Sequence, residues 1–377
     1  LNLNTCRFLW KQVKFPLAAD ASNAAVQVLK EGEVQGSDVA AHSAGVLDIR
    51  TNILADTDAL YLTAIDKYGH ELWRWTFPVN KLNQANEVLS PLSNKVTSTE
   101  TENELTVKAK NHTFIFSKKD GQLKGVSVNN RKISFANGPR FIGARRADRS
   151  LDQFYNHDDE KAKEKDRTYS EFPDAAVFTK LDVKEDGGNL IVTADYKLGN
   201  LDKVQWTINP NGEAVLDYTY NFSGVVDLMG ICFDYPEDQV ISKRWLGAGP
   251  YRVWQNRIHG TQYDVWENDY NDPIPGETFT YPEFKGYFGS VSWMNIRTKE
   301  GTISLTNETP DAYIGVYQPR DGRDRLLYTL PESGISVLNV IPPVRNKVNS
   351  TDLCGPSSQP KWVNGPQSGR IIFRFME

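Results

Sequence analysis

Aromatic and hydrogen-bonding side chains are most concentrated between Trp245 and Trp266. A sugar ring has apolar C–H faces and a belt of hydroxyl groups, so its binding site combines flat aromatic rings with planar hydrogen-bonding side chains. This stretch contains both kinds, which predicts a surface that faces carbohydrate. The residues expected to line that surface are Tyr251, Trp254, Asn256, Arg257 and His259 within the stretch, and Glu283 and Trp362 beyond it.

Each of these aromatic residues also has a simpler explanation. Tryptophans in β-strands are usually core residues, so a single Trp indicates little about binding. Gly247, Gly249 and Pro250 are expected to interrupt the strand, which would leave residues 251–257 on a loop, where binding residues tend to lie. Glu283 can equally be a residue of a strand surface, and Trp362 is better explained by core or surface packing.

The overall composition is that of a globular protein. The 377 residues are 39% hydrophobic and 24% charged, and the formal net charge of -5 is spread along the sequence, which argues against nucleic acid as a partner. No apolar run approaches the ~20 residues of a membrane helix, so a membrane is not expected as a partner either. Cys6, Cys232 and Cys354 show no metal-binding spacing. No metal or cofactor is expected.

Short apolar runs separated by turn residues predict a small β-domain over residues 1–80. Residues 60–65 and 71–77 flank the turn Asp-Lys-Tyr-Gly-His, which is typical of a hairpin. With further strands at 24–29 and 45–49, the spacing fits an immunoglobulin-like sandwich without its Cys and Trp core. Residues 81–104 are rich in Asn, Ser, Thr and Glu, which predicts a linker.

Residues 105–377 are predicted to form one large antiparallel β-sandwich. Alternating apolar and polar residues indicate half-buried strands, and Asp120-Gly121 and Asn211-Gly212 mark two hairpin tips. The predicted strands are 105–109, 113–116, 125–128, 190–194, 215–220 and 370–375. The fold class expected for the whole chain is therefore all-β, with a small sandwich followed by a much larger one.

Two motifs resemble the last domain of family 2 β-galactosidases, the region called the small chain. One is Trp-Leu-Gly-Ala-Gly-Pro-Tyr from Trp245, followed by Asn256 and Arg257; the other is Asn-Gly-Pro-Arg-Phe-Ile-Gly-Ala-Arg-Arg-Ala-Asp from Asn137. The first residues, with Cys-Arg-Phe-Leu-Trp from Cys6, resemble the immunoglobulin-like domain that precedes it. The resemblance covers nearly the whole chain.

This resemblance implies a galactose-mutarotase-like supersandwich that packs against a catalytic TIM barrel. The barrel of the family carries the two glutamates of retaining β-galactoside hydrolysis, which must lie about 5 Å apart. No segment here matches the barrel strands, so the chain is expected to be a fragment, without catalytic residues of its own and inactive alone. Its expected partners are a galactoside-like glycan, the missing barrel and possible further copies of the chain.

Two segments depart from the family pattern. Val337 occupies the position of an aromatic residue that the family's last domain lends to the sugar site, which puts galactose in doubt as the substrate. The segment from Tyr281 to Met294 is richer in aromatic residues than expected and makes a divergent specificity plausible. The start at Leu1 suggests an excised fragment of a soluble protein, and a glycan-degrading bacterial parent favours a periplasmic or extracellular location.

Two other functions are compatible with the sequence. Mutarotase-like folds include aldose 1-epimerases, which use a His acid and a Glu base, and the available candidates are His157, His259 and Glu308. A stand-alone carbohydrate-binding module is the third possibility.

Overall fold

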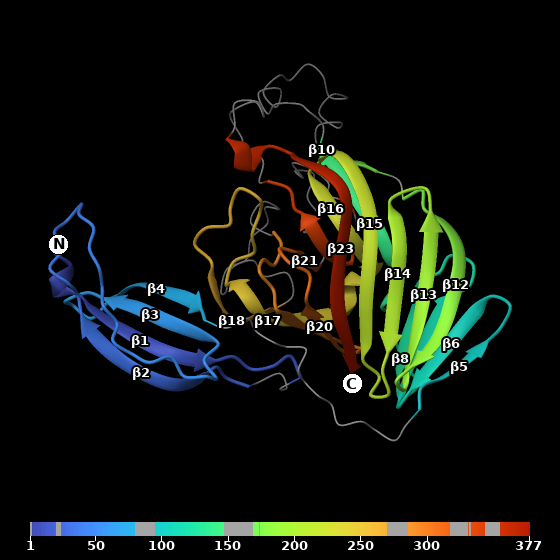
Figure 1. Cartoon of the computed structure of the whole chain (residues 1–377), viewed down its shortest axis with the longest axis horizontal. Helices are drawn as coiled ribbons and strands as arrows, with labels where there is room; N and C mark the ends of the chain where they lie inside the picture. Colours follow the sequence, from blue (N-terminus) through green and yellow to red (C-terminus); the bar gives the residue numbers. More distant parts are fainter. Residues whose placement is uncertain are drawn as a thin grey trace, which may run out of the picture.

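The computed structural model describes residues 2–19, 24–79, 95–146, 169–172, 174–269, 286–316, 331, 333–343 and 355–377. Within these ranges the regular structure consists of β-strands and short 3-10 turns, without an α-helix (Figure 1). The predicted all-β class is confirmed. No helix in the described ranges has the length and apolar character needed to cross a membrane.

The first sheet is a four-stranded antiparallel sheet in the order β2-β1-β3-β4. The predicted hairpin is present. The described strands of this part of the chain form one sheet, where a sandwich of two sheets was predicted. Residues 45–49, predicted to be a strand, are irregular: Val46 is 82% exposed, while the neighbouring Leu47 packs separately against Phe8 and Ala64. The strands are β1 (Arg7–Lys14), β2 (Gln27–Gln35), β3 (Ala59–Ile65) and β4 (Glu71–Pro78).

The second sheet has ten strands, with the main path β21-β22-β16-β10-β8-β7-β6-β5. β5 lies inside the segment predicted to be a linker, so the large sandwich begins before residue 105. The strands are β5 (Thr97–Glu100), β6 (Glu104–Ala109), β7 (His112–Ser117), β8 (Leu123–Val128), β9 (Arg131–Ile133), β10 (Ala136–Arg146), β11 (Tyr169–Glu171), β16 (Leu228–Asp234), β21 (Tyr313–Val316) and β22 (Ile335–Val340).

The third sheet has nine strands in the order β12-β13-β14-β15-β23-β20-β19-β17-β18. The strands are β12 (Val177–Asp186), β13 (Asn189–Lys197), β14 (Leu201–Ile208), β15 (Ala214–Val226), β17 (Val240–Gly249), β18 (Gln262–Asp269), β19 (Trp293–Thr298), β20 (Gly301–Asn307) and β23 (Lys361–Met376). Asp120-Gly121 and Asn211-Gly212 lie at the β7–β8 and β14–β15 turns, as predicted.

The main core lies between the ten-stranded and nine-stranded sheets. Every second side chain of β15 is buried, as the alternation in the sequence predicts. Phe135, Phe233 and Phe373 form an aromatic centre with ring centroids 4.6 to 5.6 Å apart. This large apolar core, which also contains Trp206, joins the two sheets.

A smaller apolar cluster covers the outer face of the ten-stranded sheet. It joins Ile142, Leu228 and Leu338 of that sheet to Val253 and Trp254, which come from the segment after β17. The chain beyond β17 therefore crosses from one sheet to the back of the other.

The four-stranded sheet is joined to the edge of the nine-stranded sheet by a third cluster. Phe15 and Tyr61 pack there with Leu246 and Trp293. The indole nitrogen of Trp293 donates a hydrogen bond of 3.0 Å to the carbonyl of Pro16. Because buried apolar contacts and hydrogen bonds act together, the two parts of the described chain are held in one arrangement.

Candidate functional site

Within the stretch from Trp245 to Trp266, the chain leaves the nine-stranded sheet at the end of β17. Gly249 is its last residue, and the Gly249-Pro250 peptide bond is cis. A Cβ atom on Gly249 would lie 2.4 Å from the Trp266 ring, so only glycine permits this close approach. Contrary to prediction, Gly247 and Gly249 remain within the strand, and Pro250 starts the loop. Residues 251–257 lie on a loop, as predicted.

The loop is fixed to the 3-10 turn η7 (Pro356–Ser358) that precedes β23. The side-chain amide of Gln255 donates hydrogen bonds to the carbonyls of Ser357, at 3.0 Å, and Gln359, at 2.7 Å. Asn256 Nδ2 donates to Ser358 Oγ at 3.0 Å. A tight turn also bonds the Arg257 amide to the Trp254 carbonyl at 2.8 Å. The loop is thus a well-anchored element, in which Asn256 has a structural partner.

The tryptophans of the stretch point into the protein. Trp254, predicted to face carbohydrate, is 1% exposed and packs edge-on against Tyr287, with ring centroids 5.7 Å apart. Trp245 is fully buried beside Phe288, and Trp266 donates to the Gly247 carbonyl. Apolar burial on both sheets accounts for these rings, so Trp254 is a packing residue in this structure.

Four of the predicted carbohydrate-facing residues remain at the surface. Tyr251 is 45% exposed and Trp362 is 72% exposed, and Arg257 and His259 are also exposed. Tyr251 lies near the start of the anchored loop, and Trp362 follows η7 at the start of β23. The hydrogen bonds from Gln255 and Asn256 therefore connect the segments that carry these exposed groups. Glu283 lies outside the described residues.

Val337, at the position where the family pattern has an aromatic residue, is 1% exposed and belongs to the main core. It pairs with Ile231 on one side and Ile314 on the other. Its side chain therefore fills the space between the sheets.

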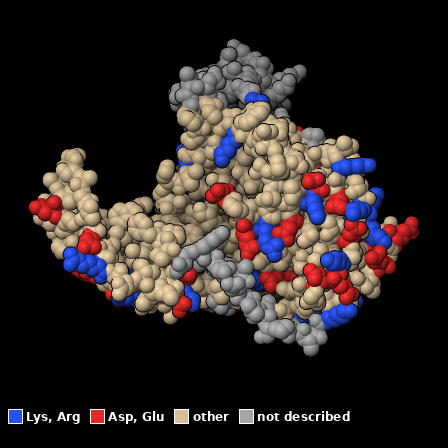
Figure 2. Space-filling view, in the orientation of Figure 1, with Lys and Arg blue, Asp and Glu red and all other residues tan. Residues whose placement is uncertain are grey.

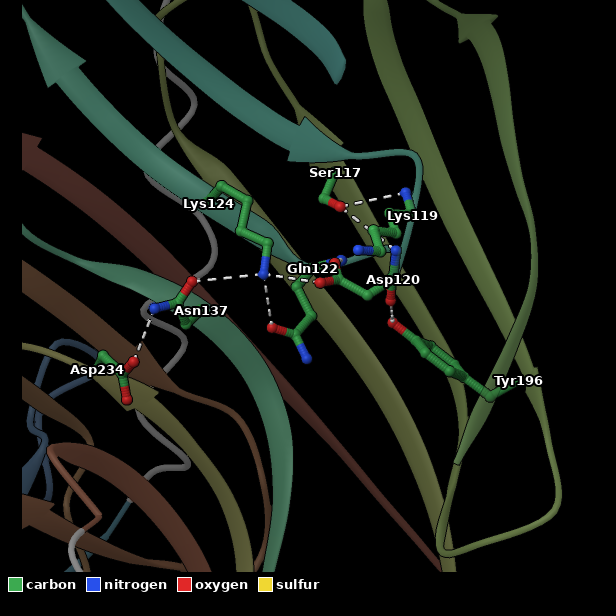
Figure 3. Close-up of polar contacts among 8 residues, drawn as sticks. All are labelled: Ser117, Lys119, Asp120, Gln122, Lys124, Asn137, Tyr196 and Asp234. Atoms are coloured by element: carbon green, nitrogen blue, oxygen red, sulfur yellow. Dashed lines mark hydrogen bonds and ion pairs between the residues drawn. The ribbon is translucent and has the colours of Figure 1, made fainter. Parts of the chain in front are cut away.

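A polar cluster that the sequence reasoning missed surrounds the second motif (Figure 3). Asn137 Nδ2 donates to Asp234 at 2.8 Å, and Lys124 Nζ lies 3.4 Å from Asn137 Oδ1 and 2.8 Å from Asp120. Arg140 Nη2 donates to the other oxygen of Asp234 at 2.6 Å. The sequence signal for this cluster is the polar run from Asn137 to Arg140, which is also part of the family motif.

The charges of this cluster balance one another. Partial burial by itself raises the pKa of Asp234, but hydrogen bonds from Arg140 and Asn137 outweigh it and hold that pKa below its usual value. Burial raises the pKa of the neighbouring Cys232 thiol to about 11, so this cysteine is protonated at neutral pH. The cluster is a structural support of the ten-stranded sheet.

The nine-stranded sheet carries a polar depression of about 440 Å³ on its surface. Arg370 lies in it and bonds both oxygens of Asp217 at 2.8 Å and Glu308 at 3.1 Å. Glu308, a candidate base of the epimerase hypothesis, is therefore already paired, and the residues lining the depression include no histidine. In the described ranges, no group of three or more His, Cys, Asp or Glu side chains is arranged to hold a metal ion.

Comparison with known families agrees with the motifs. The family described as "Beta galactosidase small chain" matches residues 108–341, which is more than half of the 377-residue chain. The chain belongs to the β-galactosidase small-chain family. The match includes both Gly-Pro motifs, and their peptide bonds, Gly138-Pro139 and Gly249-Pro250, are both cis in this small chain.

Solved structures similar to this small chain are remote in sequence. A galactose 1-epimerase from Lactobacillus acidophilus NCFM is 9% identical with a TM-score of 0.42, covering 76% of this chain and 99% of its own. An aldose epimerase homologue from C. elegans is 9% identical with a TM-score of 0.35, covering 74% and 99% respectively. No curated protein matches the chain. The family assignment rests on the match over residues 108–341.

Proposed function

We propose that this small chain is the C-terminal, non-catalytic part of a family 2 β-galactosidase-like glycoside hydrolase. It supports a separate catalytic barrel that hydrolyses terminal β-galactosides or related glycosides with retention. The family match over residues 108–341 carries this proposal. Retaining hydrolysis needs an acid/base and a nucleophile about 5 Å apart, and we assign both carboxylates to the barrel.

The anchored loop suits a role at the edge of a substrate cleft. Its hydrogen bonds to η7 fix the backbone, while Tyr251, Arg257 and His259 remain exposed. A fixed backbone lowers the entropy lost when a ligand binds. In this proposal the exposed groups of the loop, with Trp362, contact the outer part of a glycan that occupies the barrel.

We also propose that the chain holds the barrel or another copy of itself. The way the four-stranded sheet is fixed to the large sandwich supports this role. The Tyr61–Asp264 hydrogen bond and the cluster around Trp293 hold the four-stranded sheet against the large sandwich. A rigid two-part support presents one surface to a barrel without further ordering cost.

The test is reconstitution of activity. The chain is assayed with an aryl β-galactoside alone, and then with the separately produced barrel domain of its parent. We expect no turnover by the chain alone and turnover above that of the barrel after mixing. Trp362→Ala should raise KM in the mixture, whereas Val177→Ala should not, because Val177 is an exposed apolar residue of the edge strand β12, separated from β23 by three strands.

Two results would contradict the proposal. Hydrolysis by the chain alone would place catalytic groups within it. Mutarotation of galactose or glucose that is lost in His259→Ala would instead identify an epimerase. Calorimetric titration with oligosaccharides tests the third possibility, because a stand-alone binding module that used the anchored loop would bind tightly without the barrel and would lose this binding in Trp362→Ala.

A further inference from the structure

The edge strand of the four-stranded sheet carries a row of exposed aromatic side chains. Among the described residues β4 pairs with β3 alone, and Trp73, Trp75 and Phe77 are 40%, 39% and 47% exposed. Alternate residues of a strand share a face and lie about 6.7 Å apart. The three rings therefore form a row along one face, which we call the β4 stripe.

On the same face, the residues of β1 are covered by the chain itself. Trp10 and Phe8 of β1 are each 7% exposed. Gln12, on the same face, donates to Thr51 Oγ1 and to the Asn52 carbonyl and accepts from the Leu54 amide, which fixes the segment that follows residue 50 over β1. This cover leaves the aromatic row of β4 exposed.

The opposite face of β4 is held against the large sandwich. Arg74 Nε donates to Gln262 at 3.0 Å, and Arg74 Nη2 donates to Asp264 at 2.5 Å. Since neighbouring residues of a strand point to opposite faces, these bonds turn the β4 stripe away from the sandwich. The strand is thus fixed on one side and presents its rings on the other.

We propose that the β4 stripe is a binding platform for a neutral oligosaccharide. The aligned residues of β3 on the same face are Leu60, Leu62 and Ala64, so no charged group of β3 lies beside the rings. In Figure 2 the region of β3 and β4 is almost free of Lys, Arg, Asp and Glu on the face shown. Flat rings in a row match the apolar faces of successive sugar units, whose hydroxyl groups stay in water.

Two other occupants fit less well. A polypeptide strand would pair with the backbone edge of β4 and would not need a row of rings on its face. An anionic membrane surface would require basic residues around the rings. The platform goes beyond the proposed function, because it uses none of the residues placed at the cleft edge.

Binding is tested on the complete 377-residue chain with galacto-, xylo-, gluco- and manno-oligosaccharides, by calorimetry and tryptophan fluorescence. At least one series should show saturable binding. Trp73→Ala and Trp75→Ala should each weaken it at least about tenfold. Val28→Ala, an exposed apolar residue of β2 at the other edge of the sheet, should change it by less than about twofold. Trp75→Tyr, which keeps a ring, should retain most of the affinity.

The outcomes are distinct. Absence of binding in all four series, or binding unchanged in Trp73→Ala and Trp75→Ala, would overturn the platform. Concentration-dependent dimerisation that Trp75→Ala abolishes would show instead that the stripe contacts a second copy. Trp362→Ala separates this inference from the proposed function, because it should leave oligosaccharide binding by the isolated chain unchanged while raising KM in the reconstituted mixture.

Discussion

The phenol of Tyr61 donates a hydrogen bond of 2.5 Å to Oδ1 of Asp264, 203 positions away in the chain. The second oxygen of Asp264 accepts from Arg74 at 2.5 Å, and the Arg74 guanidinium lies 4.8 Å from the centre of the Tyr61 ring. One buried carboxylate on β18 therefore binds two residues of the four-stranded sheet. This contact connects the N-terminal part to the large sandwich.

Asp264→Asn should lower the free energy of unfolding. The substitution removes the charge that pairs with Arg74 and weakens the bond from Tyr61, and we expect a loss of about 2–4 kcal/mol. Chemical denaturation gives the value. Asp269→Asn, at the exposed end of the same strand, is the matched control and should change stability by less than about 0.5 kcal/mol. Equal effects of the two variants would contradict a specific role of Asp264.

Stability should fall in acid through the cluster shown in Figure 3. The pKa of Asp234 is lower in the folded chain than in the unfolded chain, so its contribution is present at neutral pH and is lost as pH falls through the folded pKa. Asp120 behaves in the same way. Burial raises its pKa, but Lys124 and nearby hydrogen-bond donors have the larger effect, so the pKa lies below its usual value. The loss should become measurable below about pH 4.

Asp234→Asn provides the check on that pH dependence. The variant should be less stable than the parent at neutral pH, and its stability should decline less between neutral and acid pH. Unfolding curves measured at a series of pH values show this directly. A parallel decline in the two proteins would mean that Asp234 does not contribute to acid unfolding.

Gly249→Ala should destabilise the end of β17. The added Cβ would lie 2.4 Å from the Trp266 ring, and displacing that ring should cost about 1–3 kcal/mol. Thermal unfolding and tryptophan fluorescence report the change. Gly125→Ala in β8 is the control, because a Cβ there meets no atom within 4 Å. A variant as stable as the parent, with unchanged fluorescence, would contradict the close contact between Gly249 and the Trp266 ring.

Gln255→Ala should release the anchored loop from η7. Two hydrogen bonds from a side chain that is 7% exposed would be lost, at a cost of about 1–2 kcal/mol. Amide hydrogen exchange should accelerate in residues 355–360 while the main core stays protected. Ile258→Ala, an exposed residue of the same loop, should leave exchange in that segment unchanged. Uniform acceleration across the chain would contradict local anchoring.

Local patterns predicted the strands of the large sandwich because alternation of apolar and polar residues has a direct physical cause. Each inward side chain of β15 must be apolar where two sheets pack together, and the turns at Gly121 and Gly212 need positive φ values. The strand predicted at residues 45–49 was wrong, because this segment is irregular: Leu47 packs on the sheet, whereas Val46 is exposed.

The candidate site was only partly predictable. A tryptophan in a strand has the same sequence signal whether it stacks on a sugar or fills a core, and Trp254 proved to be core. The Arg140–Asp234 pair was missed because its members are 94 positions apart and meet only when β10 pairs with β16.

The sequence by itself determined the all-β class, most strands of the large sandwich and the two Gly-Pro motifs that indicate the family, because these depend on local pattern. Tertiary structure alone decided which rings are exposed. Trp254 is buried because the loop crosses to the back of the ten-stranded sheet, whereas Trp73 and Trp75 stay exposed because Arg74 fixes the opposite face of β4. Exposure depends on what distant segments cover, which alternation along one strand does not encode.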